Sequence, residues 1–278
     1  MDRRRSDPDA GQDIQANRDA ALQASRKELS MSKYFNRLWL CVLLALTVGV
    51  LSSTVEAAPA AQPARTTPRP AHWWPANGTA RDRIGGDDGQ LLNGVTYTSG
   101  FSREAFHFNG QGSEVQFDEV GGNFDRDPFT LAFFIKTTSP VSQAIWGKRP
   151  VCNAASFWDF RMTGNLWGVE LDGDEFGTDD TGVLGAPIIA DGSWHHVALV
   201  RDGTSNTIYV DGANPSTAIS PHPVQLSNAV PMRAGMSACT GIDGTNPYDG
   251  DLDELMIFDQ ALSQQQINAV IDSLRKKH

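Results

Sequence analysis

Six carboxylate side chains lie within residues 170–180, and this acidic segment is the first place where the chain could carry chemistry. Glu170 and Asp172 share one face if the segment is a strand. Two carboxylates about 5–5.5 Å apart serve a retaining glycoside hydrolase as nucleophile and general acid. Asp172 is followed by Gly173, a pair typical of turns, which would carry Glu175 away from the strand. We therefore expect no enzyme, and we keep glycoside hydrolysis by Glu170, Asp172 and Glu175 as an alternative.

The same acidic segment is also a candidate calcium site, because calcium takes hard oxygen ligands such as carboxylates. Its spacing lacks the third ligand of an EF-hand loop and the glycine that follows that ligand. A solvated acidic loop is the simpler interpretation of residues 170–180.

Two adjacent histidines, His195 and His196, suggest a metal ligand or a general base. Neighbouring residues of a strand point to opposite faces, so these two rings cannot chelate one ion together. No serine or cysteine nucleophile pattern accompanies them. We therefore assign both histidines a structural role, with one ring buried and hydrogen-bonded and the other exposed.

Three tryptophans are the remaining candidates, because an exposed indole offers a sugar a flat apolar face and one N–H donor. Trp73 and Trp74 are adjacent at the start of the folded region, where at most one of them can point inward. Trp146 lies near a strand end, beside Lys148 and Arg149. All three tryptophans are candidate ligand-binding residues, and burial in the core is the alternative.

The N-terminal part of the chain follows the pattern of an exported protein. A polar leader occupies residues 1–33, and a signal peptide with a basic region, an apolar run and small residues occupies 34–58. Because the leader is long, Met31 is an alternative start to Met1. An uncleaved membrane anchor formed by residues 38–55 is the alternative to cleavage. We expect a secreted protein, extracellular or periplasmic.

Behind the signal peptide, residues 59–71 form an Ala/Pro/Thr-rich linker and residues 72–278 form one domain. The formal net charge of the chain is −10, which argues against nucleic acid as a partner and is compatible with calcium as a cofactor. Contact with a membrane is expected only through an uncleaved N-terminal segment.

The cysteines permit one disulfide in the exported protein. Cys41 is removed with the signal peptide, which leaves Cys152 and Cys239. Thiols of an exported chain usually pair, so we expect this bridge, with two buried thiols as the alternative.

Short runs of apolar or alternating residues, separated by turn residues, predict a β-sandwich and not βαβ units. Asn109-Gly110 is the predicted turn between the first two strands, and residues 129–136 are the expected central strand. The expected strands are 105–108, 114–117, 129–136, 144–147, 157–162, 166–171, 194–201, 207–210, 232–236 and 251–258.

One short C-terminal helix is also predicted. Ser263 and Gln266 form a capping box, which marks the beginning of a helix. An apolar stripe at helical spacing follows, and we expect it to pack against the sandwich; its residues are Ile267, Val270, Ile271 and Leu274.

Several of these segments together resemble laminin-G-like domains, which belong with the concanavalin A-like lectins and glucanases. The hairpin WHHVAL (194–199) and YVDG (209–212) is similar to the central hairpin of these domains. Further similarity lies in Trp73-Trp74-Pro75 with Asp82, AFHFNG (105–110), FTLAFFIKT (129–137) and GDLDELMIFDQALS (250–263). The resemblance implies an all-β, concanavalin A-like jelly-roll sandwich of two antiparallel sheets. WGKRPVC and ACTGIDGT resemble a disulfide-bearing branch, which supports pairing Cys152 with Cys239.

The resemblance also implies a function. Such domains often bind one calcium at the rim of the sandwich, and Asp82 and Asp253 lie at matching places, with Asp87 and Asp251 as alternatives. Asn109 departs from the aspartate that the family often has there. The resemblance thus implies a non-catalytic module that binds carbohydrate, with calcium assisting. A protein-binding or adhesion module is the alternative, because one fold can carry many functions.

Overall fold

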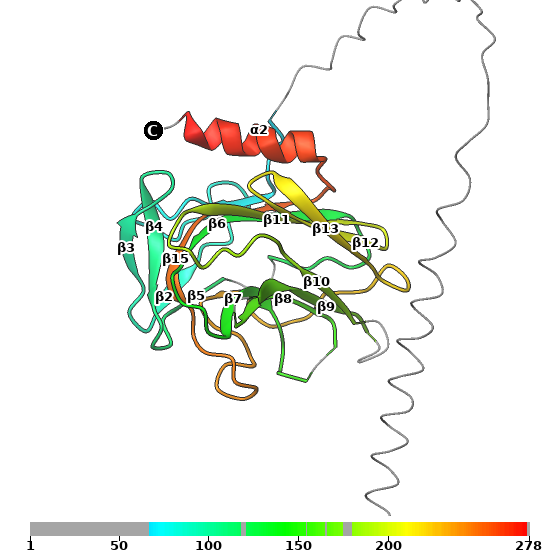
Figure 1. Ribbon diagram of the computed structural model, residues 1–278, viewed down its shortest axis with the longest axis horizontal. Helices are drawn as coiled ribbons and strands as arrows, with labels where there is room; N and C mark the ends of the chain where they lie inside the picture. The colour runs from blue at the N-terminus through cyan, green and yellow to red at the C-terminus, as the bar shows by residue number, and fades with distance from the viewer. Residues whose placement is uncertain (1–66, 118–120, 154, 165, 175–179, 277–278) are drawn as a thin grey trace, which may run out of the picture. The chain divides into compact units, whose positions relative to one another are not determined.

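The computed structural model describes residues 67–117, 121–153, 155–164, 166–174 and 180–276. These residues form two antiparallel β-sheets packed face to face, one with eight strands and one with seven. One helix lies across the outer face of the eight-stranded sheet (Figure 1). The all-β sandwich with a short C-terminal helix that the sequence predicts is therefore confirmed.

The eight-stranded sheet contains the expected central strand. Its order is β13 (Ala213–Ile219), β12 (Ser205–Val210), β11 (His195–Asp202), β6 (Phe129–Lys136), β15 (Asp249–Phe258), β4 (Glu104–Asn109) and β3 (Thr96–Ser99), and β1 (His72–Trp74) also pairs with β15. The seven-stranded sheet has the order β10 (Thr181–Leu184), β9 (Leu166–Asp172), β8 (Phe157–Thr163), β7 (Gln143–Lys148), β14 (Arg233–Ala234), β5 (Glu114–Gln116) and β2 (Gln90–Leu92).

Aromatic side chains fill the space between the two sheets. Phe133 of β6 packs edge-on against Trp146 of β7 and Phe160 of β8, with ring centroids 5.6 and 5.1 Å apart. Trp158 lies edge-on against Trp146 at 5.3 Å. Edge-to-face pairs at these separations are the preferred arrangement of aromatic rings, so this cluster fixes how the two sheets sit on each other.

Strand β6 is apolar on both faces because its outer face is buried as well. Phe134 and Ala132 point away from the central core and belong to a second cluster under the helix. Helix α2 (Gln264–Arg275) covers this cluster with its buried stripe: Ile267, Val270, Ile271 and Leu274. The predicted capping box is present, since Gln266 donates its backbone N–H to the Ser263 side chain.

The chain enters the domain beside this helix. Thr67, Pro68 and Pro70 line a small hollow of about 120 Å³ together with Leu274 and Trp73. The first described residues and the last helix therefore lie on the same side of the sandwich.

Arg201 of β11 is buried between loops that connect the sheets, with 1% of its surface exposed. Its guanidinium donates hydrogen bonds of 2.6–3.2 Å to four backbone carbonyls, those of Phe124, Asp125, Asp127 and Val224. Burial lowers the pKa of Arg201 to about 10, so the side chain stays charged at neutral pH. A buried cation is tolerated only when such donors are satisfied.

One sequence-based prediction of strand pairing is wrong, and some strands were not predicted. Strands β4 and β5 do not form a hairpin, because β4 pairs with β3 and β15 while β5 pairs with β14 and β2. Gly110 and Gly112, with φ of 68° and 93°, let the chain cross between the sheets there. Five strands had no prediction because they are short or polar: β1, β2, β3, β10 and β13.

Buried His196 gives the fold a testable pH dependence. It is 1% exposed, packs edge-on against Phe134 at 4.9 Å, and neither ring nitrogen has a hydrogen-bond partner among the described residues. Burial lowers the pKa of His196 to about 3. The unfolded chain takes up this proton near its ordinary value of 6.5, so stability is lost as the pH falls from about 6.5 to about 3.

We expect His196→Leu to lose less of its free energy of unfolding than the wild type between pH 7.5 and 4.5. Urea unfolding followed by tryptophan fluorescence measures this difference. His222→Leu, at an exposed histidine, is the matched control and should follow the wild-type curve. Equal pH dependence in the wild type and His196→Leu would contradict the assignment.

Candidate functional site

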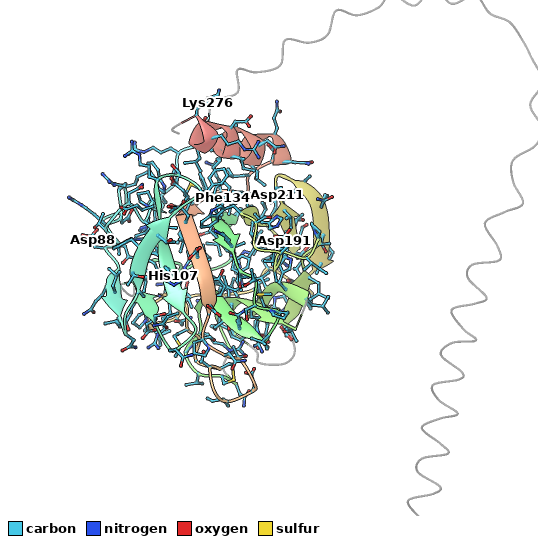
Figure 2. All side chains as sticks on the ribbon, turned by 60° about the vertical axis from the view of Figure 1, so that its left-hand side comes forward. Asp88, His107, Phe134, Asp191, Asp211 and Lys276 are labelled. Carbon is cyan, nitrogen blue, oxygen red and sulfur yellow. A yellow bond between two sulfur atoms is a disulfide. The ribbon has the colours of Figure 1, made fainter. Side chains whose placement is uncertain are left out.

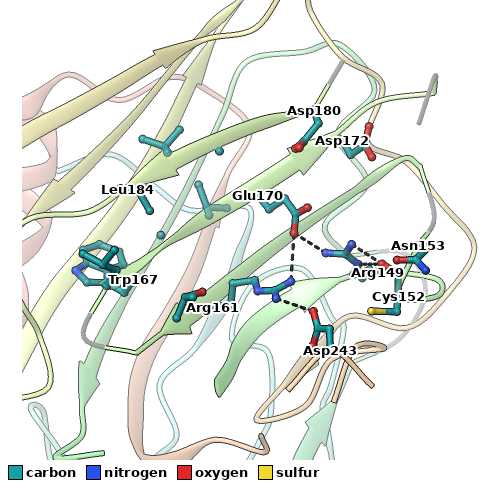
Figure 3. Close-up of a pocket in the computed structure, with 16 residues that line it drawn as sticks. Arg149, Cys152, Asn153, Arg161, Trp167, Glu170, Asp172, Asp180, Leu184 and Asp243 are labelled. Carbon is teal, nitrogen blue, oxygen red and sulfur yellow. Dashed lines mark hydrogen bonds and ion pairs between the residues drawn. The ribbon is translucent and has the colours of Figure 1, made fainter. Parts of the chain in front are cut away.

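A groove with a volume of about 450 Å³ lies on the outer face of the seven-stranded sheet (Figure 3). We call it the acidic groove. Strands β8, β9 and β10 form its floor, and the loop after β7 and the loop around Asp243 form its walls. The charged residues that line it are Arg149, Arg161, Glu170, Asp172, Asp180 and Asp243.

A chain of ion pairs runs across the floor of the groove. Glu170 Oε2 accepts from Arg149 Nη1 at 2.7 Å and from Arg161 Nη1 at 3.3 Å. Arg161 Nη2 donates in turn to Asp243 Oδ2 at 2.7 Å. Two of the four side chains come from strands β8 and β9, one from the loop that follows β7 and one from a distant loop, so each holds the others in position (Figure 3). The groove therefore presents fixed donors and acceptors to a ligand.

Arg149 is the most tightly held of these side chains. Its Nε and Nη2 atoms donate to the Cys152 carbonyl at 3.1 and 2.5 Å, and its guanidinium lies 3.7 Å from the centre of the Phe157 ring. Asp159 lies beneath it, fully buried, and accepts from the Ser237 hydroxyl at 2.8 Å. Burial raises the pKa of Asp159 to about 6.

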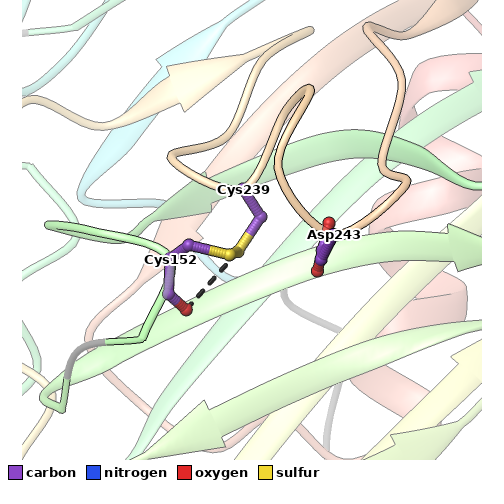
Figure 4. A group of neighbouring side chains, drawn as sticks. All are labelled: Cys152, Cys239 and Asp243. Atoms are coloured by element: carbon purple, nitrogen blue, oxygen red, sulfur yellow. Dashed lines mark hydrogen bonds between the residues drawn. A yellow bond between two sulfur atoms is a disulfide. The ribbon is translucent and has the colours of Figure 1, made fainter.

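The predicted disulfide between Cys152 and Cys239 is present, and it joins the two walls of the groove (Figure 4). Cys152 follows Arg149, and Cys239 begins the loop that carries Asp243. In the part of the chain that the structure describes, these two cysteines and Asp243 are the only cluster of three His, Cys, Asp or Glu side chains close enough to share a metal. Because the sulfurs are bonded to each other, this cluster is not a thiolate metal site.

Two exposed aliphatic side chains line the groove, and two more are its neighbours in the sequence. Leu166 and Leu184 line the groove and are 56% and 59% exposed. Val151 and Ile242, 60% and 69% exposed, immediately precede the lining residues Cys152 and Asp243. Trp167 also lines the groove, but it is only 1% exposed, so the described lining offers no open aromatic face.

The three carboxylates considered for glycoside hydrolysis lie in different surroundings. Glu170 faces the groove but is held by two guanidinium groups. Strand β9 ends at Asp172, as the Asp-Gly pair indicates, and Asp172 is only 2% exposed. Glu175 lies outside the described residues. Glu170 and Asp172 therefore do not form an accessible pair of carboxylates.

Two of the three tryptophans predicted to bind a ligand cannot do so, and that prediction is wrong for them. Trp74 and Trp146 are 0% exposed; the Trp74 indole donates to the Asp87 carbonyl at 2.6 Å, and Trp146 lies in the aromatic core. Neither ring has a free face because the space between the sheets must be filled. Trp73 is half-buried, and its indole N–H donates to Glu254 Oε2 at 2.5 Å.

The aspartates considered for calcium have separate partners. The Asp82 carboxylate accepts from four donors: the His72 ring and the backbone amides of Trp73, Ile84 and Asp87. Asp87 is buried and accepts from the Gly121 amide at 3.1 Å, while Asp251 pairs with His107 at 2.8 Å. These hydrogen bonds of Asp82 therefore stabilise the loop after β1.

Asp253 differs from the other aspartates because the effect of burial outweighs the hydrogen bonds from the backbone amides of Ser102, Glu254 and Phe101. It is 0% exposed, and its Oδ2 accepts from the Ser102 amide at 2.9 Å. Burial, together with repulsion from Glu254, raises the pKa of Asp253 to about 8. With this pKa the carboxyl is mostly protonated at neutral pH, and a bound cation would favour its ionised form.

The two histidines do point to opposite faces, as expected. His195 lies between Asp211 and Asp191, which are labelled in Figure 2, at 3.0 and 3.2 Å. These carboxylates raise the pKa of His195 against the opposing effect of burial. His196 is buried, but no described residue forms the hydrogen bond that we expected for it.

Sequence reasoning missed Arg161 and Asp243, and it mentioned Arg149 only as a neighbour of Trp146. A signal was available for Arg161, because Asp159 and Arg161 alternate on β8, and Asp159 lies opposite Glu170 in the strand register. Asp243 has no such signal, since a loop far along the chain carries it into the groove.

Comparison with known proteins identifies the family. Residues 109–268 match the family model described as Concanavalin A-like lectin/glucanases superfamily, of the laminin G type. The chain belongs to this superfamily, as its sandwich of antiparallel sheets also indicates.

A curated relative is the Sushi, von Willebrand factor type A, EGF and pentraxin domain-containing protein 1 of Rattus norvegicus, 26% identical over 161 residues. The match covers 52% of this chain and 4% of that protein, so the chain spans only a small part of this relative. No helix among the described residues is long and apolar enough to cross a membrane.

Two solved structures share the fold. The binding domain of botulinum neurotoxin DC in complex with rat synaptotagmin II has a TM-score of 0.60 and 16% identity, covering 73% of this chain and 51% of that one. Domain 4 of AbnA, an extracellular arabinanase from Geobacillus stearothermophilus, in complex with arabinotriose, has a TM-score of 0.53 and 17% identity, covering 73% and 98%.

The disulfide should matter for both stability and the groove. We expect Cys152→Ser with Cys239→Ser to lower the free energy of unfolding by about 2–5 kcal/mol, since a bridge closing a long loop restricts the unfolded chain. Chemical denaturation of oxidised wild type and the double variant measures the difference. An unchanged midpoint of unfolding would contradict this role.

Proposed function

We propose that this chain is an exported, non-catalytic binding module that holds a glycan in the acidic groove. The observation that carries the proposal is the ion-pair chain of Arg149, Glu170, Arg161 and Asp243, which fixes donors and acceptors along an open groove of about 450 Å³. Sugar hydroxyl groups both donate and accept hydrogen bonds, so such a lining suits them. The disulfide supports export, because disulfides persist in oxidising compartments.

The charge of the groove restricts the class of glycan that it can bind. Four carboxylates and two guanidinium groups line it, so its net charge is negative when all are ionised. An anionic sugar would be repelled, while a neutral one would keep the existing ion pairs. The groove is therefore proposed to take a neutral oligosaccharide.

The family and the neighbouring structures are consistent with a binding role. Domain 4 of the arabinanase is in complex with arabinotriose, and the toxin domain is in complex with a protein, synaptotagmin II. The glycosidase alternative gains no support from the described geometry, because Glu170 is held by two arginines and Asp172 is buried.

A protein ligand is the second candidate, and the exposed aliphatic rim favours it. Leu166 and Leu184 line the groove, and exposed Val151 and Ile242 each precede a lining residue in the chain. A typical protein interface has an apolar core and a polar rim. The groove has the same two kinds of surface in the opposite places, with a charged floor and apolar side chains beside it. We rank the glycan first because here the charged residues lie on the floor.

Glycan array binding of Glu170→Gln tests the proposal. The amide cannot form both ion pairs, so Arg149 and Arg161 lose their common partner, and we expect binding to neutral oligosaccharides to fall at least tenfold. Asp174→Asn is the matched control, because Asp174 pairs with Arg126 outside the groove. Array signals that do not depend on Glu170, or no signal at all, would contradict the proposal and favour a protein ligand.

We further propose that calcium assists this module through Asp253. The support is the burial of this carboxylate and its pKa of about 8, a condition that a divalent cation would relieve. Asp82, with its four donors, is the less suitable ligand.

Thermal unfolding with calcium and with chelator tests this role. In chelator, protonated Asp253 contributes its full stability to the fold below pH 3.8, the ordinary pKa of the group. This contribution is lost as the pH rises to about 8, because the pKa of Asp253 is raised in the folded chain. Calcium should remove that loss and raise the midpoint at pH 8, and Asp253→Asn should abolish both effects. The same midpoint with calcium and chelator would dismiss the ion.

A further inference from the structure

A second cavity, of about 300 Å³, lies beside β1 and the bulge of β15. We call it the basic pocket. It belongs to the eight-stranded sheet, whereas the acidic groove belongs to the other one. The residues that matter for its chemistry are Trp73, Asn77, Arg83, Ser102, Arg103 and Glu254.

The Trp73 ring is held in a defined orientation in this pocket. Its indole N–H donates to Glu254 Oε2 at 2.5 Å, and its backbone amide donates to Asp82 Oδ1 at 3.0 Å. Glu254 itself is 1% exposed and lies where the register of β15 shifts. Trp73 is the half-buried one of the predicted ligand-binding tryptophans; it packs against the cluster under α2 and also lines this pocket, so part of its surface is accessible.

Two arginines of the pocket carry charge without a carboxylate partner. Arg83 and Arg103 are exposed, and neither forms an ion pair with a described residue. Glu254 lines the same pocket but is buried against Trp73, while buried Asp82 precedes Arg83 and exposed Glu104 follows Arg103 in the chain. In a chain of net charge −10, two such guanidinium groups at one cavity make a local positive site.

The backbone around the pocket is strained. Arg103 has φ of 67° and Glu254 has φ of 53°, in the region that non-glycine residues rarely adopt. Ala76, between pocket residues Pro75 and Asn77, has φ of 53°. Such conformations cost free energy and cluster at functional sites, so their presence here supports a functional role for the pocket.

From these observations we propose that the basic pocket binds the carboxylate or sulfate group of an acidic sugar, whose ring packs against Trp73. A guanidinium presents parallel N–H donors that match two oxygens of either group. An indole supplies the flat apolar face that a sugar ring needs. Asn77 and Ser102 add polar groups at the wall. This site is independent of the acidic groove, which is proposed to take neutral sugars.

Isothermal titration calorimetry of the full chain with three oligosaccharides tests the proposal. The probes are a heparin hexasaccharide, the same hexasaccharide after desulfation, and neutral maltohexaose. We expect the acidic probes to bind, more weakly at high salt, and any binding of maltohexaose, which the acidic groove would supply, to be unaffected by the pocket variants below. Binding of the desulfated probe identifies the carboxylate as sufficient, and binding of the sulfated probe alone identifies the sulfate.

The double variant Arg83→Ala with Arg103→Gly should weaken binding of the acidic probes at least tenfold. Glycine is chosen at 103 because it accepts the positive φ and removes only the side chain. Arg81→Ala is the matched control, at an exposed arginine outside the pocket, and should bind as the wild type does.

Glu170→Gln, which alters only the acidic groove, should leave the affinity for acidic probes unchanged, so the two proposed sites can fail separately. Should the double variant unfold, Arg83→Ala alone decides, because Arg83 has an ordinary backbone conformation. No binding of either acidic probe to the wild type, or equal binding by the arginine variants, would overturn the proposal.

Discussion

The packing of helix α2 against the eight-stranded sheet decides where this molecule can meet a ligand. The helix stripe buries Phe134 of β6 and Met256 and Phe258 of β15, so the outer face of that sheet becomes a second core. The burial of apolar surface on both sides of β6 and β15 is favourable, and it makes that face unavailable to polar ligands except at its margin. Among the described residues no helix covers the seven-stranded sheet, and its outer face carries the charged groove.

Buried guanidinium groups then fix the loops around the sandwich. Arg201 bonds to four carbonyls in two connecting segments, and Arg149 bonds to the Cys152 carbonyl beside the disulfide. In both cases one side chain satisfies backbone acceptors that secondary structure does not. The loops can therefore be irregular in sequence and still hold the walls of a binding site.

Much of the fold could be predicted because it depends on local patterns. The apolar run of β6 and the capping box at Ser263 with the stripe of α2 follow from periodicity and propensity alone. The polar edge strand β13, which contains Pro215, has no such pattern and is defined by its pairing with β12. Local patterns also led to a hairpin between β4 and β5, because they do not say which sheet a strand joins.

The candidate site was less predictable, for a related reason. Glu170 and the disulfide cysteines could be singled out by residue type, but the partners of Glu170 come from β8 and the end of β7. Trp74 and Trp146 were misjudged because a tryptophan that fills the core and one that binds a ligand look alike in a sequence. Only the packing between the sheets separates them.

The place where the chain joins the domain has a mechanical consequence. Thr67 and Pro70 lie beside α2, on the outer side of the eight-stranded sheet, whereas the groove opens from the outer side of the other sheet. A carrier attached in front of residue 67 would thus be joined to the side of the sandwich opposite the groove. The groove would then face away from the point of attachment and stay accessible to a ligand.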